Sequence, residues 1–480
     1  MRLSKSKKNE PSQYEVKSFY ITEIKTPPPE PDDDYLEKIT AKEATAMINR
    51  NQSLENKHIT GDLILGRQDL ENPFEIDTED GHKVQMAGLP GHQNFVRISQ
   101  NNKVEFKKCL IDGKVVFAGM DFKNEVRFLS TRFCDELDFQ FAVFNKPLIF
   151  YGCYLQGKVS LSDSTFWDYV HFDKTLFRET ADFFNTSFQK EVSYKHAVFY
   201  ADCTFSGSRF RSSMLINPCL DFNNVVCHET AYFKDADFKG IADFEGAQFR
   251  RKSDFINAKF NYINLRQAQF GWFEMKWEQI GRKRLLFGTV SIPDIDVSKK
   301  YISEEEFNKS FQNRSDTPLT EKHRQYDILK GIFLNQGDFV SADGCFYDWK
   351  QIERKESRLG WNPESWIVKI FHYINWLSCG YGVKPIRTLF FASIMILLFG
   401  IIFTITNPSF ELTVPFYSLN EVFMSSFVKN TEYSFLVFMN FTSVTTEAGS
   451  IQHVFYLIER ILGWITLILF VTTYTRIMLR

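Results

Sequence analysis

Large apolar residues recur along the middle of the chain at alternating steps of five and six residues, and a mostly small residue stands two positions before each of them. A helix with 3.6 residues per turn cannot keep this rhythm on one face, whereas a coil with short flat sides can turn each large-plus-small pair inward. The pattern predicts a β-solenoid with coils of about 22 residues. Its large positions are Phe117, Phe122, Phe128, Phe133, Phe139, Phe144, Phe150, Leu155, Leu161, Phe166, Phe172, Phe177, Phe183, Phe188, Tyr194, Phe199, Phe205 and Phe210.

The rhythm slips by one residue after Ile216, resumes between Phe238 and Phe260, and ends at Phe270. We expect less regular strands near residues 59–66 to cap the other end. The predicted solenoid therefore covers residues 57–275, after a tail at 1–34 and a leading helix at 35–56. The small positions are Ala142, Thr175, Ala181, Thr186, Ala197, Cys203, Ser208, Ala236, Ala242, Ala247, Ser253, Ala258 and Ala268.

Two stretches carry a family resemblance. "ADFFNTSF" (181–188) and "ADFEGAQF" (242–249) are similar to the A-[DN]-[LF]-x-x signature of pentapeptide-repeat proteins. The resemblance implies a right-handed quadrilateral β-helix. Some family members imitate DNA, but that requires a strongly acidic surface, and acidic and basic residues are about equal in number between 101 and 270. The solenoid is therefore expected to be a rigid spacer or docking surface, or to bind a protein or ligand partner.

Charge and cysteine content further limit the partners and sites that this chain is expected to have. The chain has 57 basic and 59 acidic residues, so its net charge gives no attraction to nucleic acid. No signal-like apolar segment opens the sequence, and we expect the N-terminus to stay in the cytoplasm. All eight cysteines precede the first long apolar run without CxxC spacing, which indicates reduced thiols rather than a zinc or redox site.

A helical connector is predicted over 276–360. Residues 321–355 indicate two helices joined at 335–338, with Tyr326, Leu329 and Phe333 on one face of the first and Phe346 and Trp349 packing back on it. This arrangement resembles a tetratricopeptide-like hairpin.

The next segment, 361–383, is predicted to be an amphipathic helix lying on the inner leaflet. Trp366, Ile370, Ile374 and Leu377 form one apolar stripe along it. An ordinary helix packed in a soluble domain is the alternative.

A membrane domain is predicted over 384–480. Residues 388–406 and 457–477 are apolar enough to span a bilayer. Lys384 and Arg387 flank the first span, whereas Arg476 and Arg480 flank the second. The positive-inside rule then predicts a multi-pass plasma-membrane protein with both termini in the cytoplasm.

The segment between the spans contains a candidate pore loop at 432–450. Span, short helix, Thr-Thr-x-x-Gly and span together resemble two-transmembrane potassium-channel-like subunits, and the whole chain resembles prokaryotic pentapeptide-repeat membrane proteins with an ion-channel domain. The resemblance implies a selectivity filter at Thr445, Thr446, Glu447, Ala448 and Gly449. Compared with the family's Thr-Val-Gly-Tyr-Gly, this segment lacks the first glycine and the tyrosine. Four copies of Glu447 would form a carboxylate ring that favours cations, although Glu447 could also face protein or water.

Two residues of the second span carry further expectations. Glu459 matches a supporting glutamate of the superfamily, and Gly463 matches its hinge glycine, although a membrane-helix glycine also serves close packing. Gly380-Tyr381-Gly382 has the letters of a filter core but precedes the first span on its cytoplasmic side. We interpret it as a bend.

The sequence thus predicts a homotetrameric cation channel subunit, gated or assembled through the solenoid and passing monovalent or divalent cations. The alternative is a non-conducting membrane-anchored scaffold or binding protein. An enzyme is not expected, because the chain has no HExxH, no phosphate-binding glycine-rich loop and no recognisable nucleophile setting. No cofactor, resident metal or nucleic-acid partner is predicted.

Overall fold

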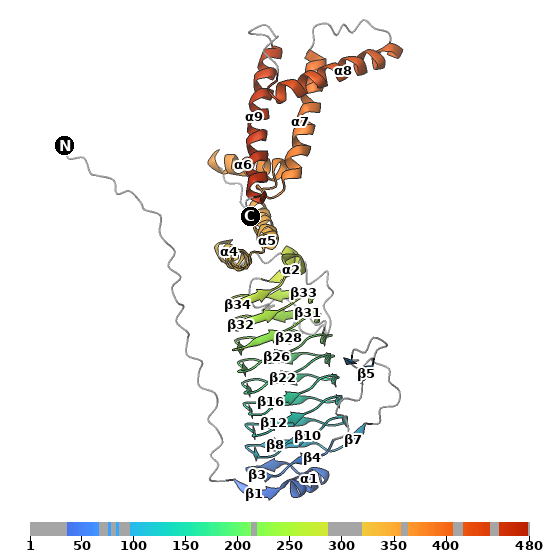
Figure 1. Ribbon diagram of the computed structural model, residues 1–480, viewed down its shortest axis with the longest axis vertical. Coiled ribbons are helices and arrows are strands. Elements are labelled where there is room, and N and C mark those ends of the chain that lie inside the picture. Colours follow the sequence, from blue (N-terminus) through green and yellow to red (C-terminus); the bar gives the residue numbers. More distant parts are fainter. Residues whose placement is uncertain are drawn as a thin grey trace, which may run out of the picture. The chain divides into compact units, whose positions relative to one another are not determined.

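The computed structural model describes residues 36–66, 75–77, 83–85, 97–212, 218–286, 319–356, 363–406, 416–441 and 451–478. Short strands wind into a β-solenoid of about ten turns, followed by a helical C-terminal region (Figure 1). The chain groups into two compact units, Met1–Asp182 with Val192–Ala201, and Phe183–Glu191 with Asp202–Arg480. The predicted solenoid is confirmed.

The strands are β1 (Glu37–Thr40), β2 (Leu54–Glu55), β3 (Lys57–Thr60), β4 (Leu63–Ile64), β5 (Glu75–Asp77), β6 (Lys83–Gln85), β7 (Ile98–Gln100), β8 (Val104–Lys107), β9 (Leu110–Ile111), β10 (Val115–Val116), β11 (Met120–Phe122), β12 (Val126–Leu129), β13 (Arg132–Phe133), β14 (Leu137–Asp138), β15 (Val143–Phe144), β16 (Leu148–Tyr151), β17 (Tyr154–Leu155), β18 (Val159–Ser160), β19 (Thr165–Phe166), β20 (Val170–His171), β21 (Leu176–Phe177), β22 (Ala181–Asp182), β23 (Ser187–Phe188), β24 (Val192–Ser193), β25 (Val198–Phe199), β26 (Cys203–Thr204), β27 (Arg209–Phe210), β28 (Leu220–Asp221), β29 (Val226–Cys227), β30 (Thr230–Tyr232), β31 (Asp237–Asp243), β32 (Gln248–Asp254), β33 (Lys259–Asn264), β34 (Gln269–Glu274) and β35 (Leu285–Leu286). The helices are α1 (Ala41–Asn49), α2 (Trp277–Arg284), α4 (Leu319–Asn335), α5 (Phe339–Glu356), α6 (Pro363–Ser378), α7 (Pro385–Thr406), α8 (Phe416–Phe438) and α9 (Ile451–Met478).

Parallel pairing fixes the coil length. In the first unit Phe122 of β11 pairs with Phe144 of β15, which pairs with Phe166 of β19, so equivalent residues are 22 positions apart. The Phe122 and Phe144 rings stack 4.7 Å apart, and the Phe144 and Phe166 rings 4.8 Å apart. In the second unit, the Phe238 and Phe260 rings stack in the same way at 4.9 Å. Coils of this constant length therefore place like side chains above one another.

Left-handed residues explain why the steps alternate. From Lys108 to Gly207, a residue with positive φ occurs at every eleventh position. Each sits in a five-residue step, within a tight turn such as the one closed by the Ala142 N–H donating to the Phe139 carbonyl at 3.1 Å. Only glycine, and asparagine or aspartate to a lesser degree, adopts this conformation at little cost. Asn185 and Gly207 are among these residues, but so are Phe141 and Lys174, which stacking of the neighbouring coils must hold in place.

The inward positions match the sequence pattern. All eighteen large residues from Phe117 to Phe210 are at most 1% exposed, and all thirteen small positions are buried as well. Ser208, one of these small residues, donates a hydrogen bond to the Phe183 carbonyl at 2.6 Å. Ser164, a buried serine outside the predicted set, donates to the Phe139 carbonyl at 2.7 Å. In each unit the core is thus a column of rings lined by small side chains.

The leading helix is shorter than predicted. Residues 37–40 form β1, which pairs in parallel with β3, and α1 covers only Ala41–Asn49. Thr40 ends the strand because its side chain accepts a hydrogen bond from the Glu43 N–H while Glu43 reaches back to the Thr40 N–H. This reciprocal cap starts the helix at Ala41.

Two coils are longer than the others. One lies between His58 of β3 and its partner Leu110 of β9, and it includes the antiparallel hairpin of β5 and β6. The other contains the slip after Ile216, and the residues at its two ends, Phe210 and Phe238, still stack at 4.6 Å. Extra residues therefore leave the column of rings unbroken.

The two helices predicted within residues 321–355 of the connector are present. The helices α4 and α5 form a hairpin in which Tyr326, Leu329 and Phe333 are at most 2% exposed, and the Trp349 ring lies 5.8 Å from that of Tyr326. Phe346 is half-buried, with the Lys330 amine 5.1 Å from its ring.

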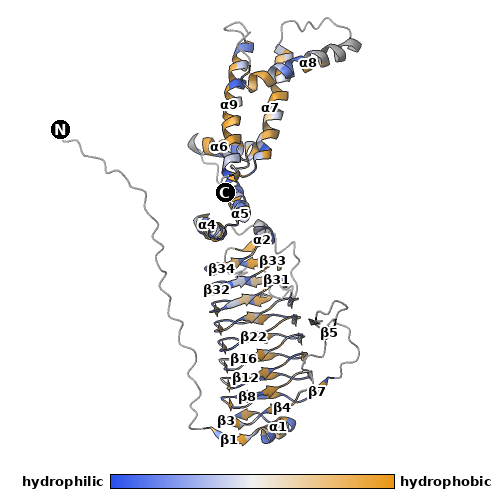
Figure 2. Ribbon diagram, in the orientation of Figure 1, coloured by the Kyte–Doolittle hydropathy of each residue, from blue (hydrophilic) through white to orange (hydrophobic). Residues whose placement is uncertain are grey.

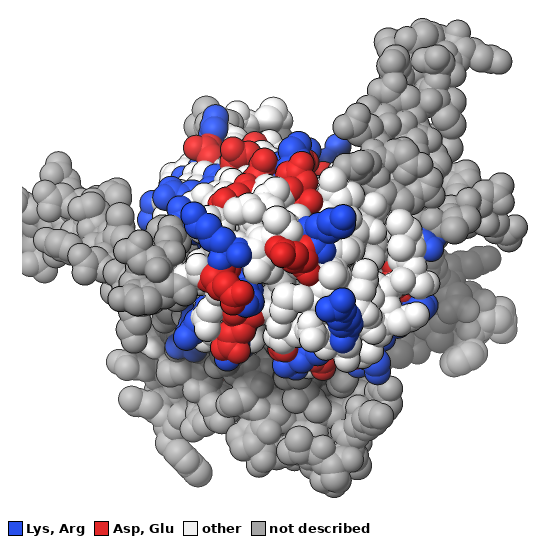
Figure 3. Space-filling view, turned by 90° about the horizontal axis from the view of Figure 1, so that it is seen from below, with Lys and Arg blue, Asp and Glu red and all other residues white. Residues whose placement is uncertain are grey.

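Lysines and arginines are interspersed with aspartates and glutamates on the face shown in Figure 3. Ion pairs join neighbouring coils, such as Lys114 with Glu136 at 3.1 Å and Lys252 with Glu274 at 2.7 Å. This face has no single-sign field of the kind that imitates DNA.

We expect Phe183→Ala to lower the free energy of unfolding by about 3–5 kcal/mol, because it empties a buried core site. The Phe183 side chain is 0% exposed and its ring stacks on Phe205 at 4.7 Å. The neighbouring Phe184 is 37% exposed and provides a matched control, for which the loss should be under about 1 kcal/mol. Denaturant unfolding of the full chain measures both, and equal losses would contradict the stacked-core account.

A second prediction concerns the buried carboxyl of Asp243, which is in register with Asp221 and Asn264 on adjacent coils. Burial, with a smaller contribution from Asp221 and Glu245, raises its pKa to about 6. A raised carboxyl pKa stabilises the fold at acidic pH, and this contribution is lost as the pH rises from about 4 through about 6.

Asp243→Asn should therefore gain about 1–1.5 kcal/mol relative to the wild type between pH 5 and pH 8. Asp235→Asn is the control, because Asp235 is exposed and asparagine tolerates its positive φ. Unfolding curves at both pH values measure the effect. Parallel pH dependence in Asp243→Asn and the wild type would refute it.

Candidate functional site

Two helices in the described residues, α7 and α9, are long and apolar enough to cross a membrane. Figure 2 shows both helices as mostly hydrophobic. Only 28% and 22% of the residues in their most apolar stretches are buried, so most of this apolar surface is exposed. A core helix of a soluble protein would instead be mostly buried. The predicted spans at 388–406 and 457–477 lie within these two helices.

A third helix, α8, packs along α7. The Cα of Gly400 on α7 leaves so little room that an added Cβ would lie 2.5 Å from the Thr431 hydroxyl. Asn430 donates to the Thr404 hydroxyl at 3.1 Å, and Ser434 donates to the Ile396 carbonyl at 2.9 Å. Small residues and polar pairs of this kind are typical of contacts between membrane helices, because the hydrophobic effect does not drive helices together in lipid.

The carboxyl end of α8 meets α9 at Gly463. An added Cβ on Gly463 would lie 2.1 Å from the Phe438 carbonyl oxygen, so only glycine permits the contact. Gly463 is twelve residues from the start of α9 at Ile451, or about 18 Å along the helix axis. The last turn of α8 therefore lies beside the middle of α9, about 18 Å along the axis from the first residue of α9.

Glu459 lies where the three helices meet. It is 0% exposed, and Ser434, also 0% exposed, contacts both its carboxyl Oε1 and the Ile396 carbonyl. One hydroxyl has one proton, so both hydrogen bonds form together only when Glu459 donates one of them. A neighbouring polar contact, from Arg460 to the Tyr456 hydroxyl at 2.9 Å, lies one position further along α9.

The structure describes only some of the predicted site residues. Glu459 and Gly463 lie in the α7–α9 bundle, and the contact of Gly463 with α8 is a packing role; its role as a hinge stays a prediction. Thr445, Thr446, Glu447, Ala448 and Gly449 lie outside the described residues. Of the pore loop predicted at 432–450, the described part is the end of α8, a helix that begins earlier than expected, at Phe416.

Gly380, Tyr381 and Gly382 form the turn between α6 and α7, and all three have positive φ. The predicted bend is confirmed. On α6 the predicted stripe of Trp366, Ile370, Ile374 and Leu377 is 49–56% exposed, so no part of the described chain covers it.

Polar and aromatic contacts connect the solenoid to these helices. Trp277 of α2, 4% exposed, donates its indole N–H to Asp348 of α5 at 2.9 Å and its backbone N–H to Ser341 at 3.0 Å. At the far side of α5, Asp343 pairs with Arg476 of α9 at 2.9 Å. Sequence reasoning missed both: Trp277 showed no pattern, and Arg476 was noted only as a flanking charge.

The described residues contain no cluster of His, Cys, Asp and Glu that could hold a metal ion. All eight cysteines are free thiols. Burial raises the pKa of the Cys153 and Cys219 thiols to about 12, which leaves them protonated and unreactive at neutral pH.

The fold and the apolar helices define a β-solenoid protein with features of membrane association. The sequence profile described as "Pentapeptide repeats (9 copies)" matches residues 233–272, so this part of the solenoid carries pentapeptide repeats. No curated protein and no solved structure matches the chain.

Gly463→Ala should destabilise the helical region, because the new methyl group would overlap the Phe438 carbonyl. We expect a loss of at least about 1–3 kcal/mol, as for other overpacked sites. The control is Gly331→Ala on α4, where no atom lies within 4 Å of the added Cβ and alanine favours the helix by about 1 kcal/mol. Thermal unfolding of the detergent-purified chain compares them. An unchanged Gly463→Ala midpoint would contradict close packing and favour a hinge.

Proposed function

We propose that this chain is one subunit of a homotetrameric cation channel, assembled or gated through its pentapeptide-repeat solenoid. The protein would lie in the plasma membrane with both termini in the cytoplasm. Four copies are required because one pore loop per chain cannot enclose a conduit.

The observation that carries the proposal is the depth at which α8 ends. Phe438 lies against a residue about 18 Å below the start of α9, yet only twelve residues separate Phe438 from Ile451. An extended chain covers about 3.3 Å per residue, so these residues can return along α9 to its start. A helix that dips and an extended segment that climbs back are the two parts of a re-entrant pore loop.

The direction of α8 favours cations. The carboxyl end of a helix carries about half a negative charge, and α8 points that end toward the middle of the bundle. In the proposed tetramer four such ends would converge, and four Glu447 carboxylates would follow in the climbing segment. Because that segment lacks the family's first glycine and tyrosine, we propose cation preference without strict potassium selectivity.

Contacts within the bundle support a fixed, rather than a loosely tethered, α8. Asn430 of α8 donates to the Thr404 hydroxyl of α7 at 3.1 Å, and Ser434 of α8 contacts both α7 and α9. A scaffold that only anchors the solenoid needs two spanning helices but no third helix packed between them.

The testing experiment is single-channel recording of the purified protein in planar bilayers with KCl on one side and NaCl on the other. We expect discrete cation currents. Glu447→Gln should reduce conductance by about twofold or more at 0.01 M salt, because a ring of fixed charge concentrates cations within the Debye length.

Glu278→Gln is the control, since Glu278 is exposed on α2, outside the apolar helices. If both variants behave alike, Glu447 does not line the pore. If a cross-linked tetramer is silent in every solution, the alternative of a non-conducting membrane-anchored scaffold replaces the channel.

A further inference from the structure

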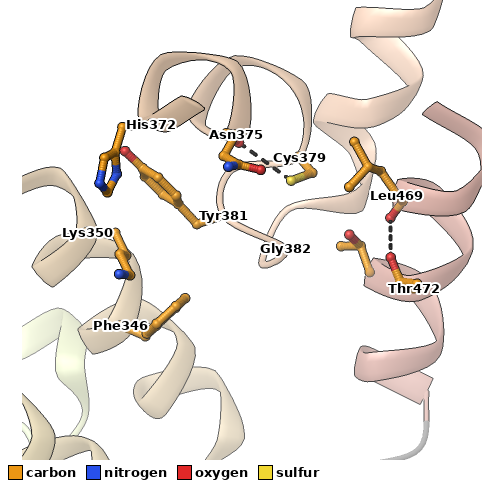
Figure 4. Close-up of a pocket in the computed structure, with 10 residues that line it drawn as sticks. Phe346, Lys350, His372, Asn375, Cys379, Tyr381, Gly382, Leu469 and Thr472 are labelled. Atoms are coloured by element: carbon orange, nitrogen blue, oxygen red, sulfur yellow. Dashed lines mark hydrogen bonds between the residues drawn. The ribbon is translucent and has the colours of Figure 1, made fainter. Parts of the chain in front are cut away.

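A cavity of about 360 Å³ lies where α5, α6, the turn before α7 and the end of α9 come together (Figure 4). Phe346 and Lys350 of α5, His372 and Asn375 of α6, and Tyr381 in the turn line it, and Leu469, Thr472 and Thr473 of α9 close the other side. Its size suits a small ligand or a lipid headgroup. The cavity thus touches the connector, the amphipathic helix and an apolar helix at once.

Hydrogen-bond donors gather on one wall of this cavity. Figure 4 shows Lys350, His372 and Tyr381 on the same side, and the His372 and Tyr381 rings lie 6.2 Å apart. The Tyr381 hydroxyl is buried and has no hydrogen-bond partner within the described chain. Burial raises the pKa of Tyr381, so the hydroxyl stays protonated as a donor. Such a group requires a partner that the described residues do not supply.

Positive charge surrounds the same place. Lys384 lies 4.3 Å and Arg387 5.6 Å from the centre of the Tyr347 ring, which itself contacts Tyr381. Neither Lys384 nor Arg387 forms an ion pair with any described residue. An aromatic face attracts a cation without neutralising it, so this charge remains available to an anion.

The nearby acids offset only part of this charge. Asp343 pairs with Arg476, and Glu353 pairs with Lys350 at 2.7 Å. Arg354 of α5 lies 4.1 Å from the ring centre of Trp376 on α6. Within the described part of the chain, neither of these carboxylates pairs with Lys384 or Arg387.

The position of the cavity indicates where its ligand comes from. The exposed apolar stripe of α6 suits a bilayer surface, while His372 and Asn375 on its half-buried side line the cavity. Leu469 gives the α9 wall an apolar part next to the donors of α5. A phosphate group attached to acyl chains can contact both the donors and the apolar wall, whereas a free anion can contact only the donors.

We propose that this cavity binds the phosphate headgroup of an anionic phospholipid, held by Lys350, His372 and Tyr381 within the field of Lys384 and Arg387. Binding would join α5 to the end of α9, beside the Asp343–Arg476 ion pair. The site rests on the membrane placement in the proposed function but not on ion conduction.

The test measures thermal unfolding of the full chain in uncharged detergent. Short-chain phosphatidylglycerol is titrated against phosphatidylcholine of equal chain length and against inorganic phosphate. We expect a saturable rise in the melting temperature with phosphatidylglycerol alone. Lys350→Gln and Tyr381→Phe should each weaken this binding by about tenfold, the value of a hydrogen bond to a charged group.

Lys429→Gln is the matched control, because Lys429 is exposed on α8 and does not line the cavity. Equal shifts with phosphatidylcholine, or equal weakening in Lys429→Gln and Lys350→Gln, would overturn the site. An equal shift with inorganic phosphate would overturn the lipid as its source. This experiment measures lipid binding and no current. If the lipid binds here but the bilayer recordings show no current, only the proposed channel function is refuted.

Discussion

Stacking of aromatic rings from one coil to the next holds the solenoid together. Each ring contacts rings of its own coil, such as Phe128 with Phe133 at 5.2 Å, and rings of the coils next to it, so stability comes from contacts between neighbouring coils. The geometry demands a tight turn of fixed length after every second side, and the left-handed residues that recur at every eleventh position provide it. Unfavourable conformations at Phe141 and Lys174 are tolerated because stacked neighbours on both sides determine the backbone path.

A column of rings needs an apolar partner at its last coil, and the connector provides one. Phe273 at the end of β34 lies 6.0 Å from Phe333 of α4, and Trp277 lies 5.6 Å from Tyr326. Gly344 allows Trp277 to approach α5, since an added Cβ would lie 2.6 Å from the indole. The hairpin of α4 and α5 is therefore the cap of the solenoid as well as the support of the helices that follow. The ion pair of Asp343 with Arg476 links α5 to α9.

The periodic parts of the chain were predictable because each inward residue repeats the same local rule. The five/six rhythm identified eighteen buried large positions between Phe117 and Phe210, but not a second buried row that includes Leu137 and Leu148. Apolar length identified α7 and α9. Short or irregular elements were harder. Strand β1 exists because β3 offers it a pairing edge, and the start of α8 shows no clear periodicity, so neither could be read from neighbouring residues. The role of Gly463 depends on the Phe438 carbonyl, a contact between distant positions that spacing does not reveal.

The enlarged coil between Phe210 and Phe238 shows how such a protein can change its length. The additional residues are accommodated in one coil while the rings at its two ends remain stacked at 4.6 Å with an interplanar angle of 7°. Coils on either side keep their register because each depends only on its neighbours. Residues can therefore be added between two coils without changing the repeat on either side.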